Sequence, residues 1–149
     1  MKNILAAVDF SDATPGVLET ASQMATALQA SLTLFHVVEP EPSYTAYGFT
    51  PDEFPAMHAF QEEAKRRAQR RLDEVVESLR PDVGKITGAI AEGSPLHCMM
   101  EYIEKYGIDL VIVGSHGHGA LASLLLGSVA EGMVRKAKTP TLVVPAAPE

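Results

Sequence analysis

The fold is decided by the stretch DLVIVGSHGHGALASLLLGSVAEGMVRKAKTPTLVV, residues 109–144. It begins with an apolar segment at 109–114, passes through a turn rich in glycine and histidine, and continues as a helical pattern from Ser128 to Lys138. A second apolar segment follows at 141–144. Two nearly continuous apolar strands joined by a helix are typical of a parallel sheet that is covered on both faces.

The same alternation extends through the rest of the chain. We expect strands at 4–8, 31–38, 85–91, 109–114 and 141–144, and helices at 14–29, 53–79, 95–106 and 128–138. This order predicts a single α/β domain over residues 1–149, a doubly wound sandwich with a five-stranded parallel sheet and helices on both faces. Ligands bind such sheets at the carboxyl ends of the strands, where the strand order reverses. Asp9, Val38 and Gly114 end three of the expected strands and should lie near that edge.

Composition and charge exclude several classes of function. The chain carries a net charge of −7, which argues against a nucleic-acid or anionic-membrane surface, because both need a basic footprint. The basic residues at 65–71 follow two glutamates on a predicted helix and are expected to form a solvated face. A single cysteine, Cys98, excludes an internal disulfide framework and fits a cytoplasmic protein. The apolar run at 4–8 is too short for a signal peptide or a membrane span.

The glycine-rich turn matches none of three common catalytic or phosphate-binding motifs. A P-loop needs G-x-x-x-x-G-K-[ST], a dinucleotide fingerprint needs G-x-G-x-x-G, and a nucleophile elbow needs G-x-S-x-G. None of these strings occurs in the turn. A metal site would need His116 and His118, completed by His36, His58 or His97, but no carboxylate or cysteine stands nearby in sequence to complete a coordination set. We therefore expect no metal site and no catalytic residues of these classes.

What remains is the spacing G-x2-G-x9-G-S, formed by Gly114, Gly117 and Gly127-Ser128. Together with VDFSD at 8–12 and TPTLVVP at 139–145, this spacing closely resembles the universal stress protein family, and the resemblance extends over essentially the whole chain. It implies a fold similar to that of the adenine nucleotide alpha hydrolases. It also implies a homodimer that forms through the C-terminal edge strand, and an exposed apolar sheet edge independently calls for a partner.

The nucleotide-binding members of that family hold ATP in a cleft at the edge of the sheet. The resemblance implies that Asp9 and the backbone around Val38 lie near adenine and ribose, that Gly114 and Gly117 line the turn beside ribose and phosphate, and that the start of the last helix receives the phosphates. The residues implied to bind the nucleotide are Asp9, Val38, Val113, Gly114, Gly117, Gly127, Ser128 and Val129. A helix N-terminus suits phosphates because it offers N–H groups and the positive end of the helix dipole.

A purely structural interpretation accounts for some of the same residues. Ser128 and Glu131 have the S-x-x-E spacing of a capping box, which would satisfy the start of the helix without any ligand. Asp9 could likewise cap the first helix, for which Thr14 and Pro15 are the expected starting residues. Capping and phosphate binding are compatible, since one helix end exposes several donors.

The chain departs from many nucleotide-binding relatives in its charge. It has no Lys or Arg between Gly107 and Met133, and His118 and Ser123 stand where basic residues would be expected. The resemblance implies a stress-response or regulatory module that binds ATP, or ADP or AMP, without efficient catalysis, and the missing basic residues make Mg²⁺ a candidate counterion. Two alternatives stay open: a slow ATPase that uses Asp9, Asp12 or His118, and a dimeric interaction protein that binds no nucleotide.

Overall fold

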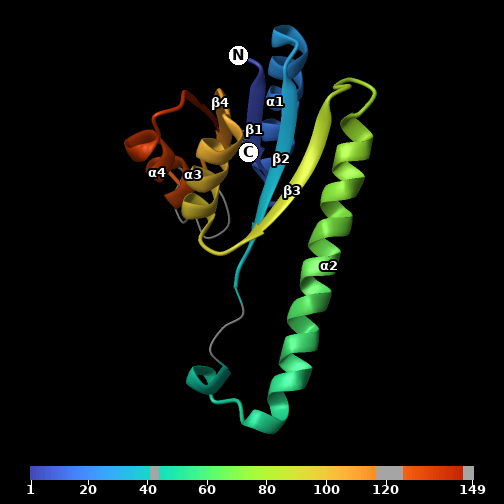
Figure 1. Cartoon of the computed structure of the whole chain (residues 1–149), viewed down its shortest axis with the longest axis vertical. Coiled ribbons are helices and arrows are strands. Elements are labelled where there is room, and N and C mark those ends of the chain that lie inside the picture. The colour runs from blue at the N-terminus through green and yellow to red at the C-terminus, as the bar shows by residue number, and fades with distance from the viewer. Residues whose placement is uncertain (41–43, 117–125, 146–149) are drawn as a thin grey trace.

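The centre of the molecule is a parallel sheet (Figure 1). The computed structural model describes residues 1–40, 44–116 and 126–145. Its five strands have the order β3-β2-β1-β4-β5, and every neighbouring pair is parallel. The strands are β1 (Asn3–Ala7), β2 (Ser31–Val38), β3 (Ile86–Glu92), β4 (Leu110–Gly114) and β5 (Thr141–Val144). The predicted five-stranded parallel sheet is thus confirmed, and the strand order reverses between β1 and β4.

Helices cover both faces of this sheet, as the sequence predicts. Figure 1 shows α1 (Thr14–Leu28) and α2 (Phe54–Leu79) on one face, with α3 (Pro95–Tyr106) and α4 (Ser128–Lys136) on the other. On β1, Ile4 packs with the α1–α2 side while Leu5 packs with the α3–α4 side, and both are completely buried. Burial of each such side chain contributes roughly 1.5–3 kcal/mol. This two-sided burial explains why apolar residues follow one another along the central strands, as at 4–7 and 110–113, rather than alternating with polar ones.

The starts of two helices differ from the sequence prediction. Ala13 is the N-cap of α1, so Thr14 lies inside the helix and not at its cap. Gly127 is the N-cap of α4 with extended backbone angles (φ −64°, ψ 159°) and no side-chain capping bond, which makes the predicted Ser128–Glu131 capping box wrong. Ser128 is one residue too late to cap the helix, and the Glu131 carboxylate instead lies 3.1 Å from Arg135.

Helix α2 extends well past the carboxyl end of the sheet. It is 26 residues long, yet its buried residues are Leu72 and Val76 in its C-terminal half. Its N-terminal half projects away from the body, as Figure 1 shows, and we call residues 53–67 the arm. The preceding connection includes two short 3₁₀ helices, Tyr44–Tyr47 and Pro51–Glu53.

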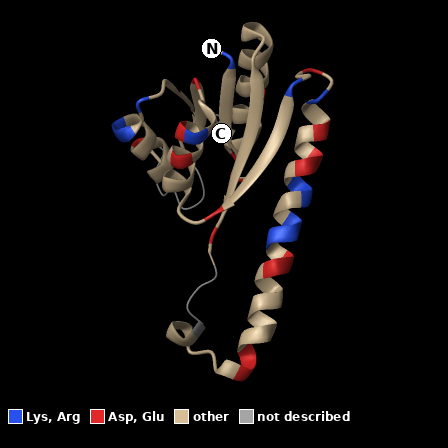
Figure 2. Cartoon of the chain, in the orientation of Figure 1, with Lys and Arg blue, Asp and Glu red and all other residues tan. Residues whose placement is uncertain are grey.

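Charged residues line α2 in alternating blocks (Figure 2). Lys65 Nζ lies 3.2 Å from a Glu62 oxygen and 2.8 Å from a Glu92 oxygen, and these contacts raise the pKa of Lys65. Arg70 lies 3.2 Å from Glu63, in a contact that runs along the helix surface. The basic cluster is thus largely neutralised within the chain. Within the described ranges, no helix combines the length and the apolar character required to cross a bilayer.

Candidate functional site

A cavity of about 430 Å³ opens at the carboxyl edge of the sheet, between the ends of β1, β2 and β4. This is where the strand order reverses, the position at which open α/β sheets bind ligands. The volume falls in the range of about 300–1,000 Å³ that is usual for small-molecule pockets. The residues of the predicted site that line it are Asp9, Val113, Gly114, Gly127, Ser128 and Val129.

One residue of the predicted site, Val38, does not line this cavity. Val38 borders a separate hollow of about 370 Å³ against α2, and its carbonyl accepts a 3.0 Å hydrogen bond from the Gly93 N–H. Its neighbours Val37 and Glu39 line the cavity instead. Gly117 falls outside the described residues.

Asp9 stands at the mouth of the cavity on the turn between β1 and α1. Its Oδ1 accepts hydrogen bonds from the Ser11 backbone N–H (2.9 Å) and the Thr14 hydroxyl (3.2 Å). The carboxylate therefore organises the turn that precedes α1, although Ala13 is the N-cap itself. These bonds also fix the exposed Asp9 side chain where it can accept hydrogen bonds from a ligand.

Beside Asp9, an aromatic contact that the sequence did not predict holds the same turn. Phe10 has a left-handed backbone (φ 59°), and its ring centroid lies 4.8 Å from that of His36. The His36 Nδ1 lies 2.6 Å from the Val8 carbonyl, which can only accept, so Nδ1 carries the hydrogen. The Arg71 guanidinium lies 4.2 Å from the Phe10 ring centroid. A non-glycine residue in this conformation costs about 1–2 kcal/mol, which the two ring contacts help to offset.

Gly114 marks a close approach between β4 and the start of α1. A Cβ at this position would lie 2.9 Å from the Ala13 Cβ and 3.3 Å from the His116 carbonyl oxygen. The ordinary carbon–carbon contact is about 3.5–4.0 Å, so no larger residue fits without a backbone shift. The glycine at the end of β4 is therefore required by packing, whatever the cavity binds.

The two ends of the glycine-rich turn are joined by backbone hydrogen bonds. The Gly127 N–H donates to the Ser115 carbonyl at 2.6 Å, and the Ser115 N–H donates to the Val144 carbonyl at 2.8 Å. Ser115 is buried, and its hydroxyl lies 2.8 Å from the His116 Nδ1. The start of α4 is in this way anchored to the ends of β4 and β5.

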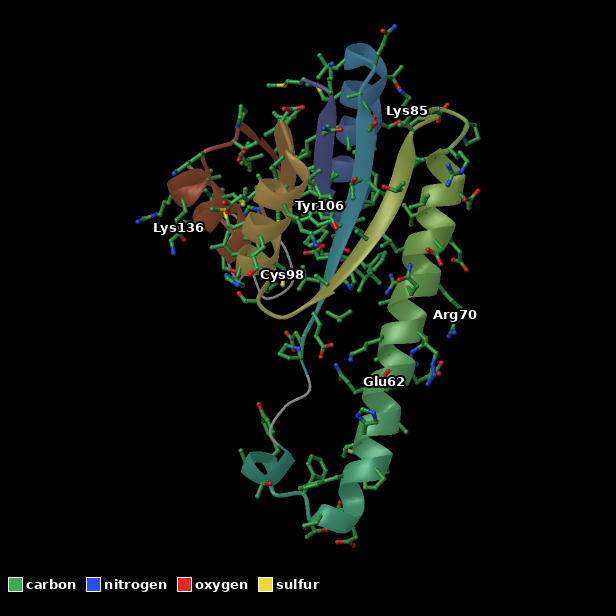
Figure 3. The ribbon with its side chains drawn as sticks, in the orientation of Figure 1. Glu62, Arg70, Lys85, Cys98, Tyr106 and Lys136 are labelled. Carbon is green, nitrogen blue, oxygen red and sulfur yellow. The ribbon has the colours of Figure 1, made fainter. Side chains whose placement is uncertain are left out.

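The N-terminus of α4 faces the cavity. Gly127, Ser128 and Val129 all line it, and the N–H groups of a first helical turn have no acceptor within their own helix. The helix dipole adds positive potential there. Among the described residues that line the cavity there is no Lys or Arg, and the basic residues of α4 lie at its C-terminal end, where Lys136 points away from the body (Figure 3).

The candidate histidine site for a metal is not assembled by the described residues. They contain no group of three or more histidine, cysteine or carboxylate side chains placed to hold an ion. His118 falls outside the described residues, and His116 is hydrogen-bonded to Ser115. The site thus consists of two acidic residues, two cavity-lining histidines, a helix N-terminus and apolar walls.

Comparisons with known proteins place the chain in a family. The model of the universal stress protein family matches residues 1–145. Universal stress protein A homolog 1 of Coxiella burnetii is 34% identical over 146 residues, which cover 96% of this chain and 95% of the relative. The structure of UspA from Lactobacillus plantarum superposes with a TM-score of 0.82 at 25% identity, covering 96% of this chain and 97% of that one.

Two more distant structures have the same fold and are described as nucleotide complexes. A universal stress protein in complex with cAMP has a TM-score of 0.68 at 22% identity and covers 98% of both chains. One from Archaeoglobus fulgidus in complex with dAMP has a TM-score of 0.65 at 20% identity, covering 97% of this chain and 98% of that one. The match of the family model to nearly the whole chain, with the 34% identical relative, decides the assignment: this chain belongs to the universal stress protein family.

Proposed function

We propose that the chain is a regulatory module that binds an adenine nucleotide, ATP or ADP or AMP, in the cavity between β1 and β4. The observation that carries this proposal is the N-terminus of α4, which opens into a cavity whose opposite side presents a fixed carboxylate, Asp9. Free N–H groups suit a phosphate, and a carboxylate suits the hydroxyl groups of a ribose. The cAMP and dAMP complexes of two structural neighbours support the same class of ligand.

The charges that line the cavity determine how strongly each nucleotide is expected to depend on Mg²⁺. The described cavity lining includes the acidic residues Asp9 and Glu39 and no Lys or Arg. A triphosphate therefore depends on the backbone N–H groups, the helix dipole and the Ser128 hydroxyl, with Mg²⁺ to neutralise the remaining charge. We propose that Mg²⁺ strengthens the binding of ATP much more than the binding of AMP, which carries fewer charges.

We propose that the protein binds its nucleotide without hydrolysing it efficiently. Asp12 does not line the cavity, and His118 lies outside the described residues. Of the three side chains considered for a slow ATPase, Asp9 is the one whose place at the cavity is described. An Asp9→Asn variant therefore tests both roles, because it keeps the size of the side chain while removing its charge.

The experiment begins with nucleotide released from the purified protein by denaturation and identified by mass spectrometry. Calorimetric titration with AMP, ADP and ATP, each with and without Mg²⁺, then measures affinity. Absence of binding by all three would overturn the proposal and leave the dimeric interaction protein as the function. Sustained phosphate release that Asp9→Asn abolishes, without loss of ATP binding, would establish the slow ATPase instead.

We also propose that two copies associate through β5 and that the protein acts in the cytoplasm, as its single cysteine suggests. Among the described strands, β5 is an edge. The Pro140 and Val144 carbonyls accept hydrogen bonds from β4, so by the alternation of a strand the Val143 N–H points to the open edge. A Val143→Pro variant removes that donor and keeps the pairing with β4. Light scattering should show loss of the dimer, whereas an unchanged mass would place the contact elsewhere.

A further inference from the structure

The arm of α2 presents a face that makes little contact with the rest of the molecule. Residues 53, 56, 60, 64 and 67 follow one another at intervals of three, four, four and three, which places them on one side of a helix. Glu53 precedes α2 but has helical backbone angles (φ −88°, ψ −16°), so it continues the same surface. We call this surface the arm face; its residues are Glu53, Ala56, Phe60, Ala64 and Arg67.

Phe60 is the large apolar residue at the centre of this face. Its side chain is 65% exposed on a helix that has already left the sheet. The α2 residues that pack on the sheet, Leu72 and Val76, lie on a different side of the helix. The arm face is therefore not buried by the fold, and solvation of a phenylalanine of this exposure is unfavourable.

The residues of the arm face are arranged symmetrically about Phe60: the nearer pair is identical, and the farther pair is opposite in charge. Ala56 and Ala64 flank the phenylalanine at four residues on either side, and Glu53 and Arg67 follow at seven residues. A two-fold axis at Phe60 that relates two antiparallel helices places each residue i against residue 120 − i of the other copy, since twice 60 is 120. Glu53 then faces Arg67 and Ala56 faces Ala64, and each pair occurs twice.

We propose that the arm face binds the arm face of a second copy of this chain, with the two helices antiparallel and Phe60 at the two-fold axis. The small alanine side chains on both sides of Phe60 let the two helices approach closely. In this arrangement the two phenylalanines cover each other at the centre, and two ion pairs close the ends. The proposal does not depend on the nucleotide site or on the β5 edge.

The state of the two charged residues supports this pairing. Lys65, Arg66 and Arg70 are ion-paired within the chain, and Arg71 lies over Phe10. Arg67 is exposed and forms no ion pair with any of the described residues. It is thus the arginine of this cluster that is left for a partner.

Glu53, at the other end of the arm face, is positioned by hydrogen bonds from Thr50. Its Oε1 accepts hydrogen bonds from the Thr50 N–H (3.1 Å) and the Thr50 hydroxyl (2.7 Å), and these bonds lower the pKa of Glu53. The carboxylate is therefore ionised and fixed in place before a partner arrives. Two crossing helices bury less than the roughly 1,200 Å² of a standard interface, so the contact is a weak one that forms at high protein concentration.

The first experiment exchanges the charges. Glu53→Arg and Arg67→Glu each turn both end contacts of a homodimer into like-charge pairs, so sedimentation equilibrium should show self-association weakened by about tenfold in each variant. An equimolar mixture of the two variants restores both contacts as opposite-charge pairs and should associate like the wild type. Arg66→Glu, the same charge change off the arm face, is the matched control. A mixture that associates no better than the single variants would overturn the proposal.

The second experiment determines the relative orientation of the two α2 helices. Its result does not depend on whether the protein also self-associates elsewhere. In a Cys98→Ser background, Ala56→Cys and Ala64→Cys chains are mixed and oxidised. Antiparallel pairing predicts a disulfide between the two different chains and little within either chain type alone, because copies of the same position lie about 12 Å apart along the axis. Ala59→Cys, off the arm face, is the control and should give no such preference. Disulfides formed mainly between identical positions, or equally in all mixtures, would overturn the proposal.

Discussion

The backbone N–H of Gly127 donates a 2.6 Å hydrogen bond to the carbonyl of Ser115, so the first turn of α4 is fixed to the end of β4. This bond accounts for the wide separation of the glycines, because the chain leaves the sheet after Gly114 and must return to the same edge at Gly127. The hydrogen bond thereby holds the helix N-terminus at the cavity, which Gly127, Ser128 and Val129 line.

A charge at residue 128 should separate ligand binding from stability. Ser128→Asp puts a carboxylate at the first residue of α4. Its interaction with the helix dipole stabilises the fold by about 0.3–1 kcal/mol, but its charge repels a phosphate. We expect an unchanged or higher melting temperature together with at least about tenfold weaker binding of AMP by calorimetry.

Ser128→Asn is the neutral control of similar size, and adenosine is the control ligand without a phosphate. Adenosine should bind the Asp and Asn variants equally well. If AMP also binds both variants equally, the phosphate does not lie at the start of α4.

Gly114→Ala should destabilise the fold because its Cβ would lie 2.9 Å from the Ala13 Cβ. Overpacking of this kind costs about 1–3 kcal/mol, measurable as a lower urea midpoint. Gly84→Ala is the matched control, since an added Cβ there meets nothing within 4 Å. It should be neutral or slightly stabilising. Equal stability of the two variants would show that β4 and α1 are not held this closely.

His36 should support the β1–α1 turn through its bond to the Val8 carbonyl. His36→Leu leaves that carbonyl without its donor and removes the ring that contacts Phe10, so we expect a loss of about 1–3 kcal/mol in the free energy of unfolding. His36→Asn can still donate from its amide nitrogen and should lose less. Chemical denaturation of both variants makes the comparison, and identical losses would mean that packing alone explains the role of the histidine.

Asp109 should make stability depend on acidity. Its Oδ2 accepts the backbone N–H groups of Lys2 (2.8 Å) and Asn3 (2.9 Å), which lower the pKa of the carboxyl in the folded protein. A carboxyl whose pKa is lower when folded stabilises the fold above its unfolded pKa of about 3.9, and this contribution is lost as pH falls through the folded value.

The difference in unfolding free energy between wild type and Asp109→Asn should therefore be present at neutral pH and shrink below about pH 4. Urea titrations at a series of pH values measure it. A difference that stayed constant down to pH 2 would show that the charge of Asp109 is not involved.

Much of the architecture is visible in the sequence because the strands are buried on both faces. Continuous apolar runs such as 110–113 mark the strands almost to the residue. The family resemblance carried by the glycine spacing pointed to Gly114 and Gly127, which both line the cavity. Helix caps were less predictable. A cap is set by where the chain enters the helix, and at α4 the Ser115–Gly127 hydrogen bond moves that entry one residue earlier than the Ser128 pattern suggests.

Contacts between distant segments were not predictable from local patterns. His36 entered the sequence argument only as a metal-ligand candidate, yet it binds a carbonyl 28 residues away and its ring contacts that of Phe10. The backbone of Phe10 has a left-handed conformation that nothing in its own residue type suggests. Such contacts depend on the register of β1 against β2, which tertiary packing decides.

The described lining of the cavity at the carboxyl edge comes from five stretches of chain, at 7–17, 35–39, 95–99, 113–116 and 127–130. Those stretches meet only when the sheet has formed, so an unfolded chain has no equivalent of the cavity. A ligand that occupies it adds RT ln(1 + [L]/Kd) to the free energy of unfolding, about 2.7 kcal/mol at a hundredfold excess over Kd. The concentration of that ligand then affects the fraction of chains that are unfolded and open to proteolysis. By changing this fraction, it also changes the amount of the protein that is present.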